Sequence, residues 1–99
     1  MQPPIQCVLR RIDPEQRARH AECLQAVRAA TRERRDLPDG YALRLDHDAA
    51  TFVTAAEWIT LERRCCGFLT FGLEWTADAT WLSLTGGDGV KEFLGRLTA

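Results

Sequence analysis

The helix predicted from Ala49 to Arg64 or Cys66 constrains the fold most, because it is apolar over more than half of its circumference. Asp48 can cap the start of this helix, and Gly67 is the glycine with which such helices commonly end. A helix with so wide an apolar surface is usually buried on two sides. One side must pack on a sheet of the same chain, and the other could contact a partner subunit.

Glu62 is a charged residue on the otherwise apolar side of this helix. At 100° per residue it falls near the centre of the apolar arc, one turn before the adjacent Cys65 and Cys66. A carboxylate in such a place must be paired, protonated or used chemically. It could accept a thiol proton, ligate a metal or pair with an inward-pointing arginine. This acid beside two sulfur atoms is the best lead to function that the sequence offers.

The other elements follow from alternation, caps and turns, and they predict the order βαβαββα. We therefore expect an α+β fold: a two-layer sandwich with a four-stranded mixed sheet and helices on one face of it. The chain of 99 residues should form a single domain, residues 1–99. The predicted strands are residues 5–10, 41–45, 68–75 and 80–85, and the predicted helices are residues 14–35, 49 to 64 or 66, and 90–97.

Several local predictions can be checked against coordinates. Asp13 and Asp88 should cap the first and last helices, and Gly40 should supply conformational freedom in a turn. His20 and His47 should both lie in solvent. The first helix should direct an inner stripe toward the sheet, made of Cys23, Leu24, Val27, Ala30 and Thr31.

The charge and composition of the chain exclude some classes of partner. The net charge is −1, so no general electrostatic attraction to nucleic acid or to an anionic membrane surface follows. No apolar stretch is long enough to span a membrane, and the N-terminus lacks the pattern of a signal peptide. We expect a cytoplasmic protein whose four cysteines are thiols rather than disulfides.

Thiolates are nucleophiles and are also the preferred ligands of soft metals. Cys65 and Cys66 project about 100° apart on a helix, but they could converge where Gly67 unwinds its end. Cys23 and Cys7, both predicted to point inward, could supply further sulfur ligands to Hg(II), Cu(I) or As(III). A structural zinc site is not expected, because neither CxxC nor HxxxH occurs. Free cysteines also often simply fill a core, and this alternative stays open.

The residues from Trp58 to Phe71 resemble a family of small uncharacterised bacterial proteins that share the pattern Glu-Arg-x-Cys-Cys-Pro-Phe-Leu-x-Phe. The resemblance extends to residues 37–41 and 84–93. A similar segment follows the DNA-binding part of some regulators that resemble mercury-resistance repressor-activators, which implies a link to soft metals. Gly67 stands where the family has proline, which leaves the backbone freer. The matching positions are Glu62, Arg63, Cys65, Cys66 and Phe68.

These observations support one main hypothesis and two alternatives. The main one is a protein that binds a soft metal, a metalloid or a small thiol-reactive ligand through Cys65 and Cys66, with Cys23 as a third ligand and Glu62 as ligand or base. The first alternative is a thiol-redox enzyme in which the same residues are catalytic. The second is a homodimeric interaction module in which the cysteines belong only to the core.

Overall fold

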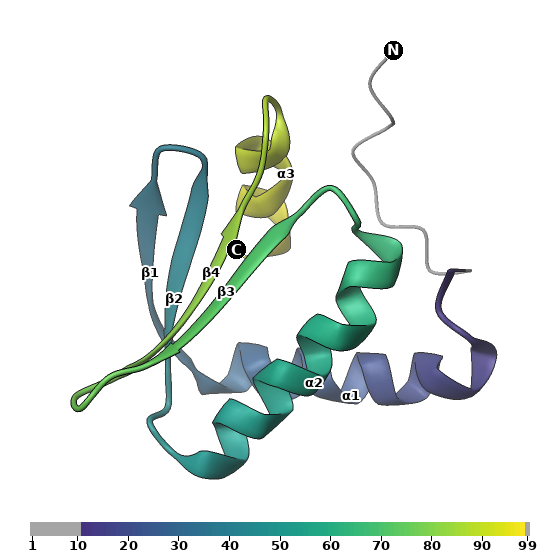
Figure 1. Cartoon of the computed structure of the whole chain (residues 1–99), viewed down its shortest axis with the longest axis horizontal. Coiled ribbons are helices and arrows are strands. Elements are labelled where there is room, and N and C mark those ends of the chain that lie inside the picture. The colour runs from purple at the N-terminus through teal and green to yellow at the C-terminus, as the bar shows by residue number, and fades with distance from the viewer. Residues whose placement is uncertain (1–10, 99) are drawn as a thin grey trace.

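Four strands form one antiparallel sheet in the computed structural model, which describes residues 11–98 (Figure 1). The strands lie in the order β1-β2-β4-β3, and each neighbouring pair is antiparallel. The α+β class is confirmed, but the prediction of a mixed sheet is wrong. The predicted strand over residues 5–10 lies outside the described residues. In chain order the elements are α1 (Pro14–Ala30), β1 (Thr31–Leu37), β2 (Gly40–Leu45), α2 (Ala49–Cys65), β3 (Thr70–Trp75), β4 (Thr80–Thr85) and α3 (Val90–Leu97).

The strand β1 is the largest departure from prediction, because the first helix was expected to continue to about Arg35. Helix α1 ends at Ala30, and the seven residues after it pair with β2. The β1 sequence TRERRDL carries few apolar residues, so it shows no alternation from which a strand could be predicted. Contacts with other strands stabilise it instead: the guanidinium of Arg34 lies over Tyr41, and that of Arg35 lies over Trp81.

The helices cover one face of the sheet, as predicted. The inward side chains of β2 and β4 are buried, and they pack in one core with Trp58 of α2 and Leu94 of α3. The opposite face forms a shallow hollow lined by both polar and apolar residues, among them Ala42, Trp81 and Ser83. No helix between residues 11 and 98 is long and apolar enough to cross a membrane. The buried strand residues are Gly40, Tyr41, Leu43, Leu45, Thr80, Leu82 and Leu84.

Some of the local predictions are confirmed and others are wrong. The Asp48 carboxylate accepts a hydrogen bond from the Thr51 backbone N–H at 2.7 Å, which confirms the cap of α2. Asp13 precedes α1 but makes no side-chain cap bond, and α3 is preceded by Gly89 at φ 85° rather than capped by Asp88. Gly40 does not have positive φ; a Cβ there would lie 1.9 Å from the Leu84 carbonyl oxygen, so close strand approach requires glycine.

Candidate functional site

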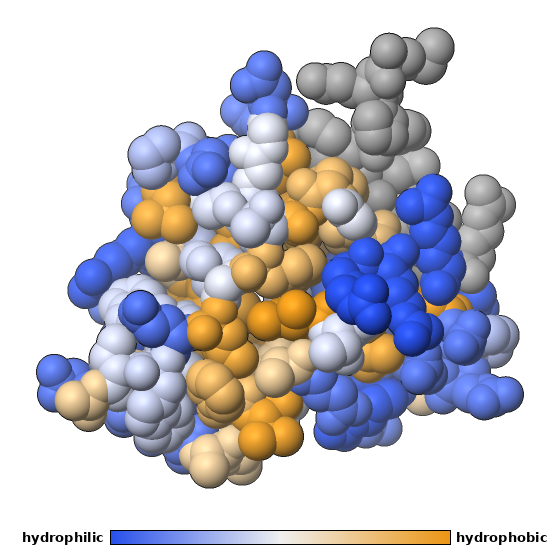
Figure 2. Space-filling view, viewed as in Figure 1, coloured by the Kyte–Doolittle hydropathy of each residue, from blue (hydrophilic) through white to orange (hydrophobic). Residues whose placement is uncertain are grey.

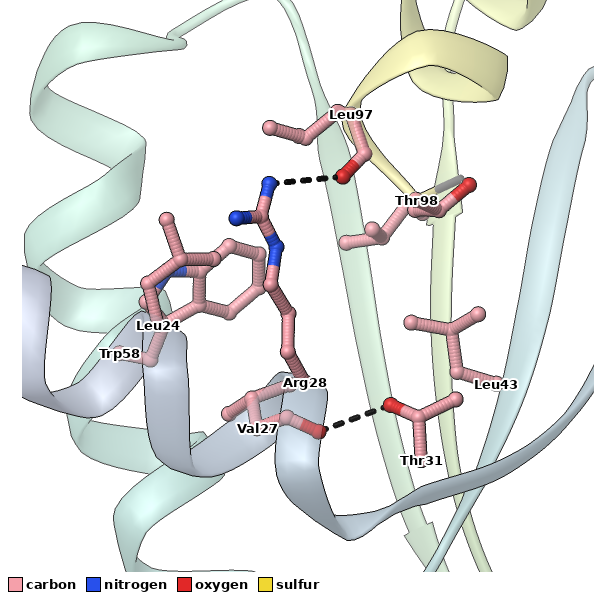
Figure 3. Close-up of a pocket in the computed structure, with 9 residues that line it drawn as sticks. Leu24, Val27, Arg28, Thr31, Leu43, Trp58, Leu97 and Thr98 are labelled. Atoms are coloured by element: carbon pink, nitrogen blue, oxygen red, sulfur yellow. Dashed lines mark hydrogen bonds between the residues drawn. The ribbon is translucent and has the colours of Figure 1, made fainter.

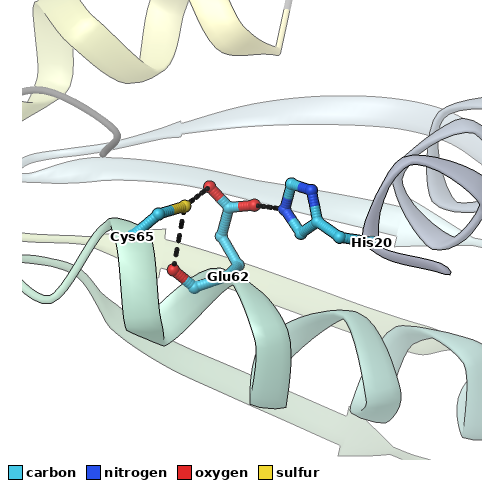
Figure 4. Close-up of side chains that lie close together, drawn as sticks. All are labelled: His20, Glu62 and Cys65. Atoms are coloured by element: carbon cyan, nitrogen blue, oxygen red, sulfur yellow. Dashed lines mark hydrogen bonds and ion pairs between the residues drawn. The ribbon is translucent and has the colours of Figure 1, made fainter. Parts of the chain in front are cut away.

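Glu62 lies at the start of the last turn of α2 and points into the interior toward α1 (Figure 4). Only 3% of its side chain is exposed, so the prediction of an inward-facing acid is confirmed. The residue reaches this position because α2 packs on α1 and the apolar arc of α2 faces that contact. Its carboxylate therefore has little contact with water and depends on protein partners for its stability.

The partner of Glu62 on α1 is His20, whose Nε2 atom forms a short ion pair or hydrogen bond with Oε2 of the carboxylate. His20 is buried, so the prediction that it lies in solvent is wrong. A signal for this position was present in the chain. His20 lies three residues before Cys23 and four before Leu24, and so extends the inner stripe of α1 by one turn.

Both neighbouring sulfur atoms approach the other carboxylate oxygen of Glu62. The Sγ atom of Cys66 lies 3.0 Å from Oε1 and that of Cys65 lies 3.5 Å from it. The two sulfurs are 3.7 Å apart, because Cys66 leaves the helical conformation with φ −122° and ψ 58°. The predicted convergence of the pair at the end of α2 is therefore confirmed.

The oxidation states of the cysteines differ. Cys23 and Cys65 are free thiols, whereas Cys66 is disulfide-bonded, so the prediction of thiols throughout is wrong for Cys66. Cys7 lies outside the described residues. Cys23 is fully buried on α1, where it lies beside Glu57 and not in the group around Glu62.

The Cys65 thiol is held in its protonated form. Burial raises its pKa to about 12, and the charge of Glu62 and the hydrogen bond to it act in the same direction. Arg63 and Arg64, which could have favoured a thiolate, are exposed, and Arg64 donates to the side-chain oxygen of Gln16. A thiol of this kind is a poor nucleophile near neutral pH, which weighs against a catalytic role for Cys65.

Three buried residues nevertheless offer a compact set of metal ligands. One ligand atom each from His20, Glu62 and Cys65 lies within 4.8 Å of the others. The set combines imidazole nitrogen, carboxylate oxygen and sulfur, which suits borderline and soft metals better than Mg²⁺ or Ca²⁺. Because α1 supplies one ligand and α2 supplies two, an ion bound here would join the two helices.

A cavity of about 220 Å³ lies elsewhere in the described part of the chain. It is bounded by α1, α2, α3 and the sheet (Figure 3). Its walls are mostly apolar, and at its mouth the Arg28 guanidinium donates to the Leu97 carbonyl oxygen at 3.0 Å. None of His20, Glu62 and Cys65 lines it.

Comparison of the chain with protein-family models, with curated proteins and with solved structures finds no match. The fold therefore defines only a broad class, an α+β protein with an antiparallel sheet and three helices.

Proposed function

We propose that the protein binds a soft metal ion or metalloid, such as Hg(II), Cu(I) or As(III), between α1 and α2. The single observation that carries this proposal is the set of three buried ligand atoms from His20, Glu62 and Cys65 within 4.8 Å of one another. Cys66 would add a second sulfur in the reduced protein, since its Sγ lies 3.7 Å from that of Cys65. In this proposal His20 replaces Cys23, which the sequence analysis had suggested, as the third ligand.

The competing interpretation is that His20 and Glu62 only stabilise the contact between the helices. Two features favour a metal over that interpretation. A buried acid–base pair costs desolvation energy that apolar residues would avoid, and here the pair also lies against two sulfur atoms. Metal binding must displace the Cys65 proton, so affinity should rise with pH.

The test uses reduced protein titrated with Hg(II), Cu(I) and arsenite, with Zn(II) as the comparison metal and glutathione as a competing thiol. Native mass spectrometry measures the bound equivalents. We expect one equivalent that survives glutathione in the wild type and in the control variant Cys23→Ser, but not in Cys65→Ser/Cys66→Ser. His20→Ala should weaken binding by about tenfold or more. Unchanged stoichiometry in the double serine variant would rule the proposal out.

A thiol–disulfide function is the second candidate, because the free Cys65 sulfur lies 3.7 Å from the disulfide-bonded Cys66. Attack by a Cys65 thiolate on that sulfur would form a bond between the two neighbours and release the other sulfur of the disulfide as a thiolate. The raised pKa of Cys65 disfavours the thiolate that this step needs. Rapid alkylation of Cys65 at neutral pH in the folded protein would favour this candidate over metal binding.

A further inference from the structure

The outer edge of β3 pairs with no strand among residues 11–98, so its backbone groups there have no ladder partner in that part of the chain. Edge strands of this kind readily accept another strand, and natural proteins usually protect them with charges, prolines or bulges. The two edge strands of this sheet, β1 and β3, differ sharply in such protection.

Strand β1 is a protected edge. Five of its seven residues in the sequence TRERRDL are charged, and its pairing with β2 is irregular between Thr31 and Glu33. Strand β3, with the sequence TFGLEW, has one charged residue, Glu74, no proline and a regular register against β4. The sheet therefore has one edge that repels an added strand and one that would accept it.

The phase of the β3–β4 ladder identifies the outward groups. The Thr76 N–H donates to the Ala79 carbonyl oxygen at 2.9 Å, so this opposed pair is a hydrogen-bonded one. Hydrogen-bonded and non-bonded pairs alternate in an antiparallel ladder. The residues whose N–H and C=O groups point toward β4 are therefore Thr70, Gly72 and Glu74. The residues whose groups point to the outer edge are Phe71, Leu73 and Trp75.

The three residues whose backbone groups point to the outer edge also have apolar side chains. Phe71 and Leu73 are half-buried, Trp75 is 49% exposed, and Val53 on the neighbouring helix α2 is 63% exposed. Figure 2 shows apolar side chains gathered on this face of the molecule, between β3 and α2. Backbone groups without a ladder partner in residues 11–98 and exposed apolar side chains thus occur along the same strand.

We propose that a second copy of this chain pairs with β3, so that two sheets join into one across a two-fold axis at Leu73. In antiparallel pairing about that axis Leu73 faces the partner's Leu73, and Phe71 faces the partner's Trp75. All three outward residues of each copy then enter the ladder. Axes at Gly72 or Glu74 would leave one outward residue of each strand without a counterpart within β3.

Charge is compatible with this register and disfavours the axis at Glu74. With the axis at Leu73, each Glu74 lies opposite the partner's Gly72, so no like charges face each other directly. An axis at Glu74 would oppose the two carboxylates, which is destabilising. The strand is therefore complementary to itself in the register that uses the most backbone groups.

The test combines sedimentation equilibrium with amide hydrogen exchange followed by NMR. We expect a dimer at submillimolar concentration, in which the amides of Phe71, Leu73 and Trp75 are protected and exchange faster on dilution. Trp75→Lys removes both symmetric Trp75–Phe71 contacts and should weaken dimerisation by roughly thirtyfold. The matched control is Trp81→Lys on the central strand β4, which should leave the dimer constant unchanged.

Each other outcome overturns the proposal. A wild-type monomer does so whether its β3 amides exchange fast, because the edge stays open, or slowly, because a segment of the same chain covers it. A dimer with rapidly exchanging β3 amides must use another surface. The exchange measurement on the wild type keeps the proposal testable even if Trp75→Lys fails to fold.

Discussion

Two acid–base pairs join α1 to α2, and they differ mainly in their exposure to water. The Arg19 guanidinium donates two hydrogen bonds to the Glu57 carboxylate, at 2.6 and 2.8 Å, with side chains that are 47% and 38% exposed. The neighbouring residue on α1, His20, meets Glu62 with side chains that are 8% and 3% exposed. Adjacent positions on one helix thus support pairs in opposite environments.

The difference shows that good hydrogen-bond geometry does not set the energetic importance of a pair. Water and salt can replace either partner of an exposed pair, so its net contribution is small. A buried carboxylate that loses its partner cannot recover its hydration, so we expect the loss of one partner to cost much more stability in the interior pair. Three predictions test this contrast, from the largest expected effect to the smallest.

Replacement of the buried acid should have the largest effect. Glu62→Ala leaves His20 buried without its partner and should lower the free energy of unfolding by about 3–5 kcal/mol, measured by urea unfolding. The double variant His20→Leu/Glu62→Met should recover much of that loss, because apolar residues of similar size need no hydration. Equal loss in the single and double variants would mean that the pair does not act as a unit.

Stability at alkaline pH should report how well water reaches the Cys65 thiol beside the buried pair. The pKa of Cys65 is raised to about 12 from an ordinary 9.0, so above pH 9 the folded state keeps a proton that the unfolded state loses. Its contribution to stability is therefore complete below pH 9 and declines toward pH 12, by up to about 1.4 kcal/mol per pH unit. Cys65→Ala should show a shallower decline by urea unfolding between pH 9 and 10.5. Parallel curves for the two proteins would show that Cys65 is better hydrated than its burial indicates.

Replacement of the exposed acid should have the smallest effect. Glu57→Gln should change the urea midpoint only slightly, because water replaces the lost contact with Arg19. Any difference should disappear at high salt, where exposed charges are screened. A large loss that persists at high salt would contradict the contrast between the two pairs.

The candidate site could be predicted in part from local pattern. The placement of Glu62 on the apolar arc and its spacing from Cys65 and Cys66 indicate the inward acid and its sulfur neighbours, and the structure contains both. His20 was missed, although its spacing from Cys23 places it on the inner stripe of α1. Its partner lies 42 residues away, and no local rule can pair residues so far apart.

Patterns within single segments were enough to specify the bounds of α2 and α3, the hairpin of β3 and β4, and which β2 and β4 side chains turn inward, because these depend on near neighbours. The remaining features depend on how segments that are distant in the sequence pack against one another. The polar residues 31–37 become β1 because β2 offers a pairing edge and because Tyr41 and Trp81 offer aromatic faces for the arginines. The β1–β2 and β3–β4 pairs are antiparallel because hairpins join them, whereas the antiparallel pairing of β2 with β4 is decided by packing. His20 meets Glu62 for a similar reason: two helices must bury their apolar sides together, and a buried charge must then find its partner across that contact.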